Sequence, residues 1–536
     1  MEKVLELRRK LASTQPAHDT PLGRLHPYWA RKPLNIIRQI IKTLSSERDF
    51  VLDPFMGCGT TVFGCLFENR NVIASDINPL SSLIVEGSLN LCKKPQEQLS
   101  ILSEFVEAFR DETTPWYSYN SGENIIERER YCVKGQFENG DFKLIPQEFI
   151  LKTQMGNRFG NRKSISRRDI VFEERSKRFE SFLSSPINFE KYKLTANSRI
   201  AIPRGALLSH YFTSRNRASI NYAMRLIEKT ADNDGIRRML KFFLSSSLSL
   251  LRLSDYKASS QWPYWRPKEK LTSRTPIFIF NRRLEEFKKA QKWLLANTPM
   301  FQLNEFGRNK ENKQFLQVIV KKASIQEIRK QSINKKVDLV LTDPPYGDQV
   351  PYLEYSSLWI NSLGLSICKN DYEEEIVKTD AKGRQIHASK YLNKLLLSLD
   401  ICAEVLKEGG YLAWFYQDPL IQNWAALHKK STEIGLQFKI VIPLPKQRRS
   451  MKTVTTPGKT FDGDLLLIFQ KKENGTLQFS SSKELKRGAM QAALKNIKSS
   501  NSSFFSSYSR IIQKSFEQGW IDELASRYSD FRAILG

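Results

Sequence analysis

Short apolar runs separated by helical stretches near the start of the chain predict an α/β fold. Residues 50–52 and 72–74, the latter at the centre of a predicted strand at 71–75, are short apolar runs, and an apolar helical stretch lies between them. Runs that are apolar throughout are typical of strands buried on both faces, and strand–helix–strand order is typical of parallel pairing. We therefore predict that a parallel sheet begins here.

The same alternation returns in the last part of the chain. The pattern predicts strands at 316–320, 337–342, 411–415 and 464–469, and helices at 324–329, at about 390–406 and, with many charges, at 371–378. The strand at 464–469 closes the predicted sheet.

Residues 93–312 do not alternate in this way and are predicted to form an inserted domain of mixed α and β structure. A hairpin pattern covers 131–151 around 138–141, and the apolar positions Ile220, Ala223, Met224 and Ile227 have helical spacing. A basic, mainly helical tail follows from about residue 475. The alternatives for this tail are that it packs against the rest of the chain, that it binds a partner, or that it does neither. The predicted division is 1–92 and 313–474 for the sheet domain, 93–312 for the insert and 475–536 for the tail.

The charge of the chain adds a polyanionic partner to this picture. The 536 residues include 84 Lys and Arg against 57 Asp and Glu, a formal net charge of +27. Solubility needs far less charge, so the excess favours nucleic acid, with an anionic membrane surface as the second choice. The hydrophobic share of 40% is that of a globular chain and excludes wholesale disorder.

The cysteine and apolar patterns concern metals and membranes. Six cysteines lie apart, without a CxxC pair or a histidine cluster, so neither a metal site nor a disulfide framework is predicted. No apolar run approaches the roughly 18 residues of a membrane span, and residues 1–10 form a charged helical pattern without an apolar signal core. We expect a soluble, cytoplasmic protein with no membrane partner.

The loop after the first predicted strand has the composition of a nucleotide-binding turn. Asp53-Pro54-Phe55-Met56-Gly57-Cys58-Gly59-Thr60-Thr61 places two glycines before a helix, where the backbone can approach a ligand and the helix dipole adds favourable charge. Asp76 ends the next strand, from where a carboxylate can accept hydrogen bonds from both ribose hydroxyls of a nucleoside. A structural turn and a solvated strand-end carboxylate are the alternatives.

Asp343-Pro344-Pro345-Tyr346 directly follows the predicted strand at 337–342, and its prolines fix the backbone there. The amino group of a planar heterocycle is a poor nucleophile because its lone pair is delocalised into the ring. The Asp343 carboxylate and the Pro344 carbonyl can hold its two hydrogens and steer the nitrogen towards tetrahedral geometry. The Tyr346 ring can stack on a base removed from its helix. A proline turn that merely ends a strand is the structural alternative.

Together these two motifs resemble those of the S-adenosylmethionine-dependent DNA amino-methyltransferases, which methylate adenine N6 or cytosine N4. Residues 25–33, Leu-His-Pro-Tyr-Trp-Ala-Arg-Lys-Pro, are similar to a segment of this family that helps to close the methionine end of the cofactor pocket. The resemblance covers about 20–92 and 313–472. It implies a Rossmann-like methyltransferase sheet with helices on both faces, interrupted by an insert that recognises the DNA target.

The resemblance also implies the residues of the site. S-adenosyl-L-methionine would lie over the strand ends near the glycines, and no metal is needed. The implied cofactor-binding residues are His26, Pro27, Tyr28, Asp53, Pro54, Phe55, Gly57, Gly59, Thr60, Thr61, Asp76, Asn78 and Ser324. The implied catalytic residues are Asp343, Pro344, Pro345 and Tyr346.

Adenine N6 is the expected target, because the cytosine-directed members of the family more often carry Ser in place of the first Asp of this motif. Cytosine N4, a structured RNA and a non-catalytic nucleic-acid-binding subunit with this fold are the alternatives. Double-stranded DNA is the expected partner, and a restriction or anti-phage defence subunit is a second candidate.

Basic clusters supply the predicted contacts to DNA phosphates. They are Arg158, Arg162, Lys163, Arg167 and Arg168 in the insert, and Lys446, Arg448 and Arg449 in a loop before the last strand. A solvated charged face is the alternative for the first cluster. The aromatic residues of 261–266 belong either to a wedge or stacking surface for DNA or, more commonly for such residues, to the core.

Overall fold

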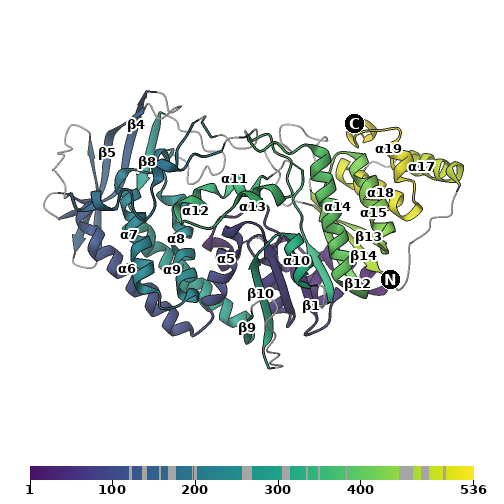
Figure 1. Ribbon diagram of the computed structural model, residues 1–536, viewed down its shortest axis with the longest axis horizontal. Helices are drawn as coiled ribbons and strands as arrows, with labels where there is room; N and C mark the ends of the chain where they lie inside the picture. The colour runs from purple at the N-terminus through teal and green to yellow at the C-terminus, as the bar shows by residue number, and fades with distance from the viewer. Residues whose placement is uncertain are drawn as a thin grey trace.

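A computed structural model provides the structure. It describes residues 1–17, 19–119, 123–135, 142–155, 158–166, 177–195, 197, 202–203, 205–255, 269–304, 314–332, 336–347, 350–381, 383–445, 463–472, 482–498 and 502–535. Figure 1 shows the large sheet in the middle of an elongated molecule, the insert at one end and the C-terminal helices at the other.

An eight-stranded sheet forms the centre of the molecule, in the order β13-β14-β12-β11-β1-β2-β10-β9. The strands are β1 (Phe50–Asp53), β2 (Asn71–Asp76), β9 (Phe301–Leu303), β10 (Leu316–Lys322), β11 (Val337–Thr342), β12 (Leu406–Tyr416), β13 (Leu436–Pro445) and β14 (Gly463–Lys471). The pairs from β9 to β12 are parallel, and β14 pairs antiparallel with both β12 and β13.

The strand order reverses direction at β1. The chain runs from β1 outward to β2, whereas β11, which follows much later, returns to pair with the other side of β1. Leu52 of β1 lies beside Val340 of β11, so the loops after these two strands leave the sheet next to each other. Such a reversal point is where open α/β sheets bind their ligands.

Helices cover both faces of this sheet, because successive strand residues point to opposite faces and both sets are apolar. Val51 and Val72 belong to a core with α1 (Glu2–Ser13), α3 (Leu34–Leu44) and α4 (Thr60–Phe67), whereas Leu52 and Ile73 face the other side. There they share a core with α10 (Ile325–Ser332), α14 (Ala388–Val405), α15 (Ile421–Glu433) and α18 (Phe504–Gln518). The predicted Rossmann-like sheet with helices on both faces is confirmed.

The sheet extends further than the apolar pattern predicts. β9 joins it from within the range assigned to the insert, and β13 was not predicted at all. β9 has three half-buried residues, too few to show a pattern. The charged helix predicted for 371–378 is also only partly present, because α13 (Lys369–Glu374) ends early and the buried Glu375 pairs with Arg384.

The described part of the tail packs against the sheet. Tyr508, Ile512 and Phe516 of α18 are fully buried in the same core as β12 and β14, and α18 lies against β13. The Tyr508 hydroxyl donates to the carbonyl of Asp418 at 3.1 Å. Of the alternatives for the tail, packing is therefore realised in its described part.

The insert combines helices with a second, antiparallel sheet. Its helices are α6 (Pro95–Tyr117), α7 (Ser214–Thr230), α8 (Asp234–Leu251) and α9 (Pro276–Asn297). The sheet runs β6 (Arg158–Ser166), β5 (Phe142–Met155), β4 (Asn124–Gly135), β8 (Lys270–Arg274), β7 (Ser254–Asp255), and β3 (Ser118–Tyr119) pairs with β4. The predicted hairpin is the β4–β5 pair, and the predicted helical face of 220–227 is buried in α7.

A continuous core joins the insert to the sheet domain. α5 (Pro79–Asn90) packs along α8, and the Trp359 indole of α12 (Ser357–Ser362) donates to the Ser245 carbonyl at 2.9 Å. The boundaries at 92, 312 and 474 stay predictions.

The remaining helices are α2 (Pro21–Leu25), α11 (Tyr352–Tyr355), α17 (Lys483–Lys498), α19 (Ile521–Ala525), α20 (Arg532–Leu535), η3 (Lys177–Phe182), η4 (Phe189–Lys191) and η5 (Leu208–Tyr211). Among all helices of the described residues, none is long and apolar enough to cross a membrane.

The contact between α5 and α8 yields a prediction for stability. A Cβ atom at Gly87 would collide with the Phe242 side chain, whereas a Cβ at Gly488 of α17 would meet nothing within 4 Å. Gly87→Ala should lower the free energy of unfolding by about 1–3 kcal/mol through overpacking, despite the better helix propensity of Ala. The matched change Gly488→Ala should raise it by about 0.5–1 kcal/mol. Thermal denaturation measures both, and a Gly87→Ala variant as stable as Gly488→Ala would contradict this packing.

Candidate active site

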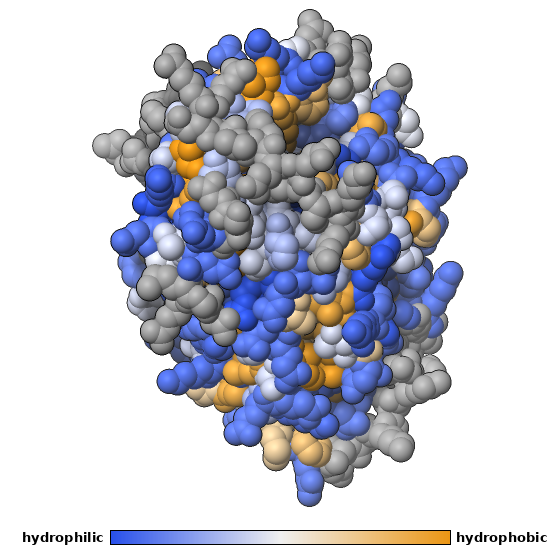
Figure 2. Space-filling model, turned by 90° about the vertical axis from the view of Figure 1, so that its left-hand side faces the viewer, coloured by the Kyte–Doolittle hydropathy of each residue, from blue (hydrophilic) through white to orange (hydrophobic). Residues whose placement is uncertain are grey.

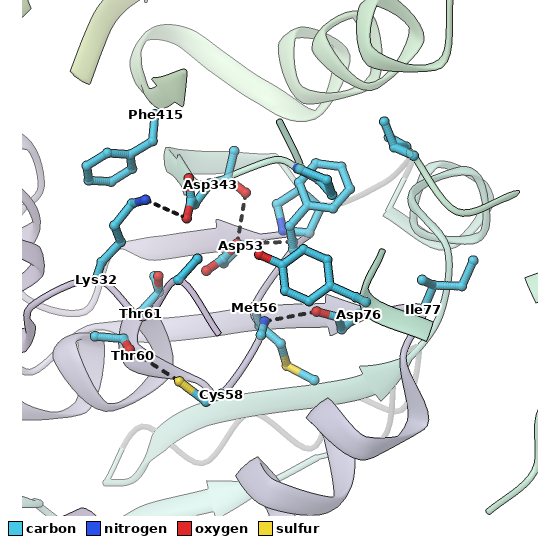
Figure 3. Close-up of a pocket in the computed structure, with 18 of the residues that line it drawn as sticks. Lys32, Asp53, Met56, Cys58, Thr60, Thr61, Asp76, Ile77, Asp343 and Phe415 are labelled. Carbon is cyan, nitrogen blue, oxygen red and sulfur yellow. Dashed lines mark hydrogen bonds and ion pairs between the residues drawn. The ribbon is translucent and has the colours of Figure 1, made fainter. Parts of the chain in front are cut away.

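A cavity of about 910 Å³, counted out to its open mouth, lies where β1, β2 and β11 end (Figure 3). It is lined by 28–32, Ile37, 53–58, Thr60, Thr61, Asp76, Ile77, 323–325, 341–343, Pro345, Tyr352, 374–376 and Phe415. Segments from both sides of the insert therefore meet in one cavity.

Asp53 at the end of β1 ties the two motif-bearing strands together. Its Oδ1 atom accepts hydrogen bonds from the Thr342 hydroxyl of β11 at 2.9 Å and from the Phe55 amide at 3.1 Å. Burial raises the pKa of Asp53 to about 7, although hydrogen bonds from Thr61, Thr342 and the Phe55 amide oppose the rise. Asp53 is therefore held as a structural anchor of the cavity floor.

The two glycines of the β1–α4 loop have different structural tasks. Gly57 has φ of +50° and Gly59 has φ of +81°, a region of backbone conformation that strongly favours glycine. A Cβ at Gly57 would approach the Tyr28 ring to 3.0 Å inside the cavity, whereas a Cβ at Gly59 would approach Val85 to 2.5 Å in the core. Only Gly57 lines the cavity.

Asp76 at the end of β2 points into the cavity from the side opposite Asp343 (Figure 3). Its two oxygens accept the amide of Gly57 at 2.9 Å and the amide of Asn78 at 2.8 Å. Burial raises the pKa of Asp76 to about 6, and these amide hydrogen bonds oppose the rise. A carboxylate with about four lone-pair positions keeps capacity for further donors after two such bonds.

Residues 28–32 of the upstream segment 25–33 form one wall of the cavity. The Tyr28 hydroxyl is 2.8 Å from the Ser81 hydroxyl, and its ring centroid lies 6.0 Å from that of Tyr352. Arg31 fixes the segment by donating to the carbonyls of Gly23 and His26 at 2.6 and 2.9 Å. The aromatic side chains of this segment are therefore held against the ends of the strands.

Asp343 follows β11, and both of its carboxylate oxygens have donors. Oδ2 lies 2.8 Å from the Lys32 ammonium, and Oδ1 accepts a hydrogen bond from the Tyr346 hydroxyl. Burial raises the pKa of Asp343, and Lys32 opposes this rise. The Pro345 carbonyl accepts the Tyr391 hydroxyl at 2.9 Å, whereas the Pro344 carbonyl has no donor among the described residues.

The structure brings most of the predicted cofactor residues into the cavity. Those that line it are Tyr28, Asp53, Pro54, Phe55, Gly57, Thr60, Thr61, Asp76 and Ser324. Ser324 also caps α10, since its hydroxyl accepts the Glu327 amide at 3.3 Å. Of the predicted catalytic residues, Asp343 and Pro345 line the cavity, while the Tyr346 ring packs edge-on against Tyr416 with centroids 6.1 Å apart.

Four predicted cofactor residues, His26, Pro27, Gly59 and Asn78, do not line the cavity. His26 is buried against Phe242 and Trp359, and burial lowers its pKa to about 3. Asn78 is fully buried and caps α5, its Oδ1 atom accepting the Leu80 amide at 3.1 Å. These side chains support the cavity wall from behind.

Lys32, Tyr352 and Phe415 line the cavity but were not predicted as site residues. Of these three residues, Lys32 had a signal in the sequence, because it lies within the motif-like segment 25–33. Phe415 lies near the end of β12, which pairs with β11. This pairing could have been inferred from the order of the predicted strands along the chain. Among the described residues, no cluster of three His, Cys, Asp or Glu side chains is arranged to hold a metal ion.

The predicted DNA-contact residues are only partly described. Arg162 makes two hydrogen bonds of 2.7 Å to the Glu127 carboxylate, which leaves it less free for a phosphate, while Lys163 is exposed. Arg158 is described only in its backbone, and Arg167, Arg168, Lys446, Arg448 and Arg449 lie outside the described residues, as does 261–266. Figure 2, which views the insert end of the molecule, shows a mainly hydrophilic surface with small apolar patches.

A family model described as DNA methylase matches residues 7–84 and 337–528, half of the chain. The chain belongs to the DNA methylase family. The two matched parts contain β1, β2 and β11 to β14, and thus the Asp53, Asp76 and Asp343 corners of the cavity. The match leaves out the whole range predicted as the insert, 93–312, and includes most of the tail.

Type II methyltransferases are among the proteins most similar to this DNA methylase. M.MjaII of Methanocaldococcus jannaschii is 23% identical over 348 residues, which are 62% of this chain and 60% of that protein. M.MthZI of Methanothermobacter thermautotrophicus is 23% identical over 128 residues, 22% of this chain and 36% of that protein. M.HpaI of Haemophilus parainfluenzae is 44% identical over 52 residues, 10% of this chain and 17% of that protein. The chain thus spans less than two thirds of the length of these relatives.

The buried Asp53 yields a prediction about pH. Because its pKa in the folded protein, about 7, lies above its value in the unfolded chain, the stability that it contributes is present at acidic pH and lost as pH rises through about 7. Between about pH 5 and about pH 8, wild type should lose roughly 1–4 kcal/mol of unfolding free energy relative to Asp53→Asn. Thermal unfolding of both proteins across this range measures the difference, and a difference independent of pH would contradict the buried, proton-binding Asp53.

Proposed function

We propose that this DNA methylase transfers a methyl group from S-adenosyl-L-methionine to the N6 amino group of adenine in DNA. The observation that carries this proposal is the arrangement of one cavity with two differently equipped ends. Asp76 and the Gly57 turn lie at one end, and Asp343 lies at the other. A cofactor bound at the first end would present its reactive group towards the second.

The residues of the first end fit S-adenosylmethionine. Asp76 provides a carboxylate that ribose hydroxyls can use, and the absent side chain of Gly57 leaves a cradle that a Cβ would narrow against Tyr28. Phe55 and Ile77 supply apolar walls for an adenine ring, and Ser324 supplies a hydroxyl beside them. The cofactor, when bound, supplies an electrophilic methyl group on a positively charged sulfur.

The second end fits an exocyclic amino group. Such a group has two hydrogens, and the Asp343 carboxylate and the Pro344 carbonyl can accept one each, which turns the nitrogen lone pair towards the methyl donor. Tyr346 would lie against the base once its hydroxyl releases Asp343, to which it donates in this structure. Much of the acceleration would come from holding nitrogen and methyl carbon in line.

The choice of adenine rests on the aspartate of the motif, since the resemblance associates Ser at this position with cytosine N4. Cytosine N4 carries the same kind of amino group and is the neighbouring alternative. The relatives M.MjaII, M.MthZI and M.HpaI are named Type II methyltransferases. A corresponding role of this chain in the modification half of a restriction system belongs to the proposal.

Double-stranded DNA as the substrate is supported by the net charge of +27 and by the insert beside the cavity. The exposed Lys163 of β6 is available for phosphate contacts. Arg162 pairs with Glu127, so its guanidinium would have to bind a phosphate beside that carboxylate. We propose that the insert recognises the target sequence. If the insert reads the DNA sequence, the residues of the cavity need only hold the cofactor and the target base. The chemistry in the cavity then does not depend on the DNA sequence around that base.

The proposal predicts that Asp343→Ala abolishes methyl transfer to DNA but leaves the dissociation constant for S-adenosylmethionine within about twofold of wild type. The carboxylate acts on the amino group and not on the cofactor, so only transfer is lost. Labelled-methyl transfer and calorimetry measure the two quantities. Wild-type turnover in this variant would refute the assignment of Asp343.

Asp76→Ala is the matched control, because it removes a carboxylate from the opposite end of the same cavity. It should weaken cofactor binding by about 1–3 kcal/mol through the loss of charge-assisted hydrogen bonds to the ribose. Transfer should return when the cofactor concentration is raised. An unchanged affinity would remove Asp76 from the cofactor site.

A further inference from the structure

Lys32 is the centre of a buried group of three charges at the catalytic end of the cavity. Its ammonium lies 2.8 Å from the Asp343 carboxylate and 3.1 Å from the carboxylate of Asp464, at the start of β14. The three side chains are 10%, 23% and 19% exposed. One cation from before the insert is thus shared by two carboxylates that both follow the insert in the sequence.

Aromatic rings confine the ammonium to this position. It lies 5.1 Å from the centroid of the Phe415 ring and 5.3 Å from that of Tyr346. Figure 3 shows the Lys32 side chain extended towards Asp343, with Phe415 beside it. Ring faces attract a cation, so the two rings add to the ion pairs in holding it.

The position of Lys32 conflicts with the proposed substrate. Asp343 receives Lys32 on Oδ2 and the Tyr346 hydroxyl on Oδ1, so each oxygen already has one donor before any base arrives. The target amino group, as a further donor, competes with the stronger charge-assisted bond from Lys32. A lysine that simply left would cost several kcal/mol if its ammonium stayed buried without a partner.

Asp464 removes that cost. Because it already lies 3.1 Å from the ammonium, Lys32 can give up Asp343 and keep a full ion pair by a small rotation of its side chain. The Tyr346 hydroxyl, 3.4 Å from the same ammonium, can accept from it during the exchange. The ammonium therefore keeps one carboxylate partner if it gives up the other.

We propose that Lys32 is a positioning residue that occupies the amino-group position of Asp343 in the absence of DNA and passes to Asp464 when the target base enters. This inference rests on the proposed function. In the first position Lys32 keeps Asp343 ionised and oriented, and in the second it frees a carboxylate oxygen without leaving a buried charge unpaired.

The charges around Asp343 determine how pH should affect this exchange. Besides Lys32 and Asp464, the titratable groups facing it are Tyr346, Asp53 and Tyr352. Burial raises the pKa of Asp343, and Lys32 is the cation that opposes this rise. Burial alone would lower the pKa of Lys32, but Asp343 and Asp464 raise it well above its ordinary value, so the lysine stays charged.

A stability cycle tests the coupling without an activity assay. Lys32→Met keeps the apolar length of the side chain and removes its charge, which should raise the pKa of Asp343 further. Since a carboxyl with a raised pKa in the folded state loses its stabilising contribution as pH rises, the melting temperature of Lys32→Met should fall relative to wild type as pH rises through the range in which Asp343 ionises. Adding Asp343→Asn should remove most of this fall, and Lys42→Met, the same change at an exposed lysine of α3, should show none.

The pH profile of methyl transfer tests the positioning role. At the acidic end of the profile, Lys32→Met should turn over about tenfold more slowly than wild type and recover as pH is raised, because more of the unpaired Asp343 is then ionised. Lys32→Arg should restore the wild-type profile in part. Asp464→Asn should raise KM for DNA, since Lys32 would lose its second partner, while the dissociation constant for S-adenosylmethionine stays unchanged.

The possible results separate the two proposals. If wild type transfers methyl groups and Lys32→Met shows the same rate and pH profile, Lys32 has no positioning role. If Lys32→Met loses cofactor affinity at every pH without a change in the profile, Lys32 belongs to the cofactor site and the inference is refuted. If wild type transfers no methyl group to DNA, the proposed function falls, and the inference with it, whatever the stability cycle shows.

Discussion

The parallel pairing of β1 with β11 is the constraint on which the rest of the site depends. These strands are separated by nearly 290 residues of sequence but are adjacent in the sheet. The Thr342 hydroxyl donates to Asp53 across the pair, although the two residues are 289 positions apart in the chain. Because parallel strands end at the same edge, this pairing places the glycine turn and the Asp343 motif in one cavity. The insert can be large because it leaves and re-enters the sheet away from this edge.

Burial of acids is the cost of that arrangement. Asp53, Asp76 and Asp343 all lie at the cavity, and burial raises the pKa of each of them. The structure offsets this in different ways. Amides and hydroxyls serve Asp53 and Asp76, whereas Asp343 receives the ammonium of Lys32. Fixed donors suit an anchor, and an exchangeable one suits the role proposed for Asp343.

Much of the sheet and the two ends of the cavity could be predicted from the sequence, because they depend on local pattern. β1, β2, β11 and the residues that follow them show apolar runs and short motifs. Asp464, Arg162 and β9 illustrate what could not be predicted. The partner of Asp464 is more than 400 residues away, Arg162 of β6 is engaged by Glu127 of β4, two strands across the second sheet, and β9 is too short to show periodicity. Such features depend on which segments the tertiary fold brings together, and a single sequence does not encode that as a local signal.

The identity of the methylated base tests the central claim most directly. DNA is incubated with the wild-type protein and methyl-labelled S-adenosylmethionine, digested to nucleosides and separated, with Asp343→Ala as the blank. The account predicts that the label appears in N6-methyldeoxyadenosine and is absent from the blank. Label in N4-methyldeoxycytidine would contradict the assigned target, and no protein-dependent label in either nucleoside would contradict the proposed function.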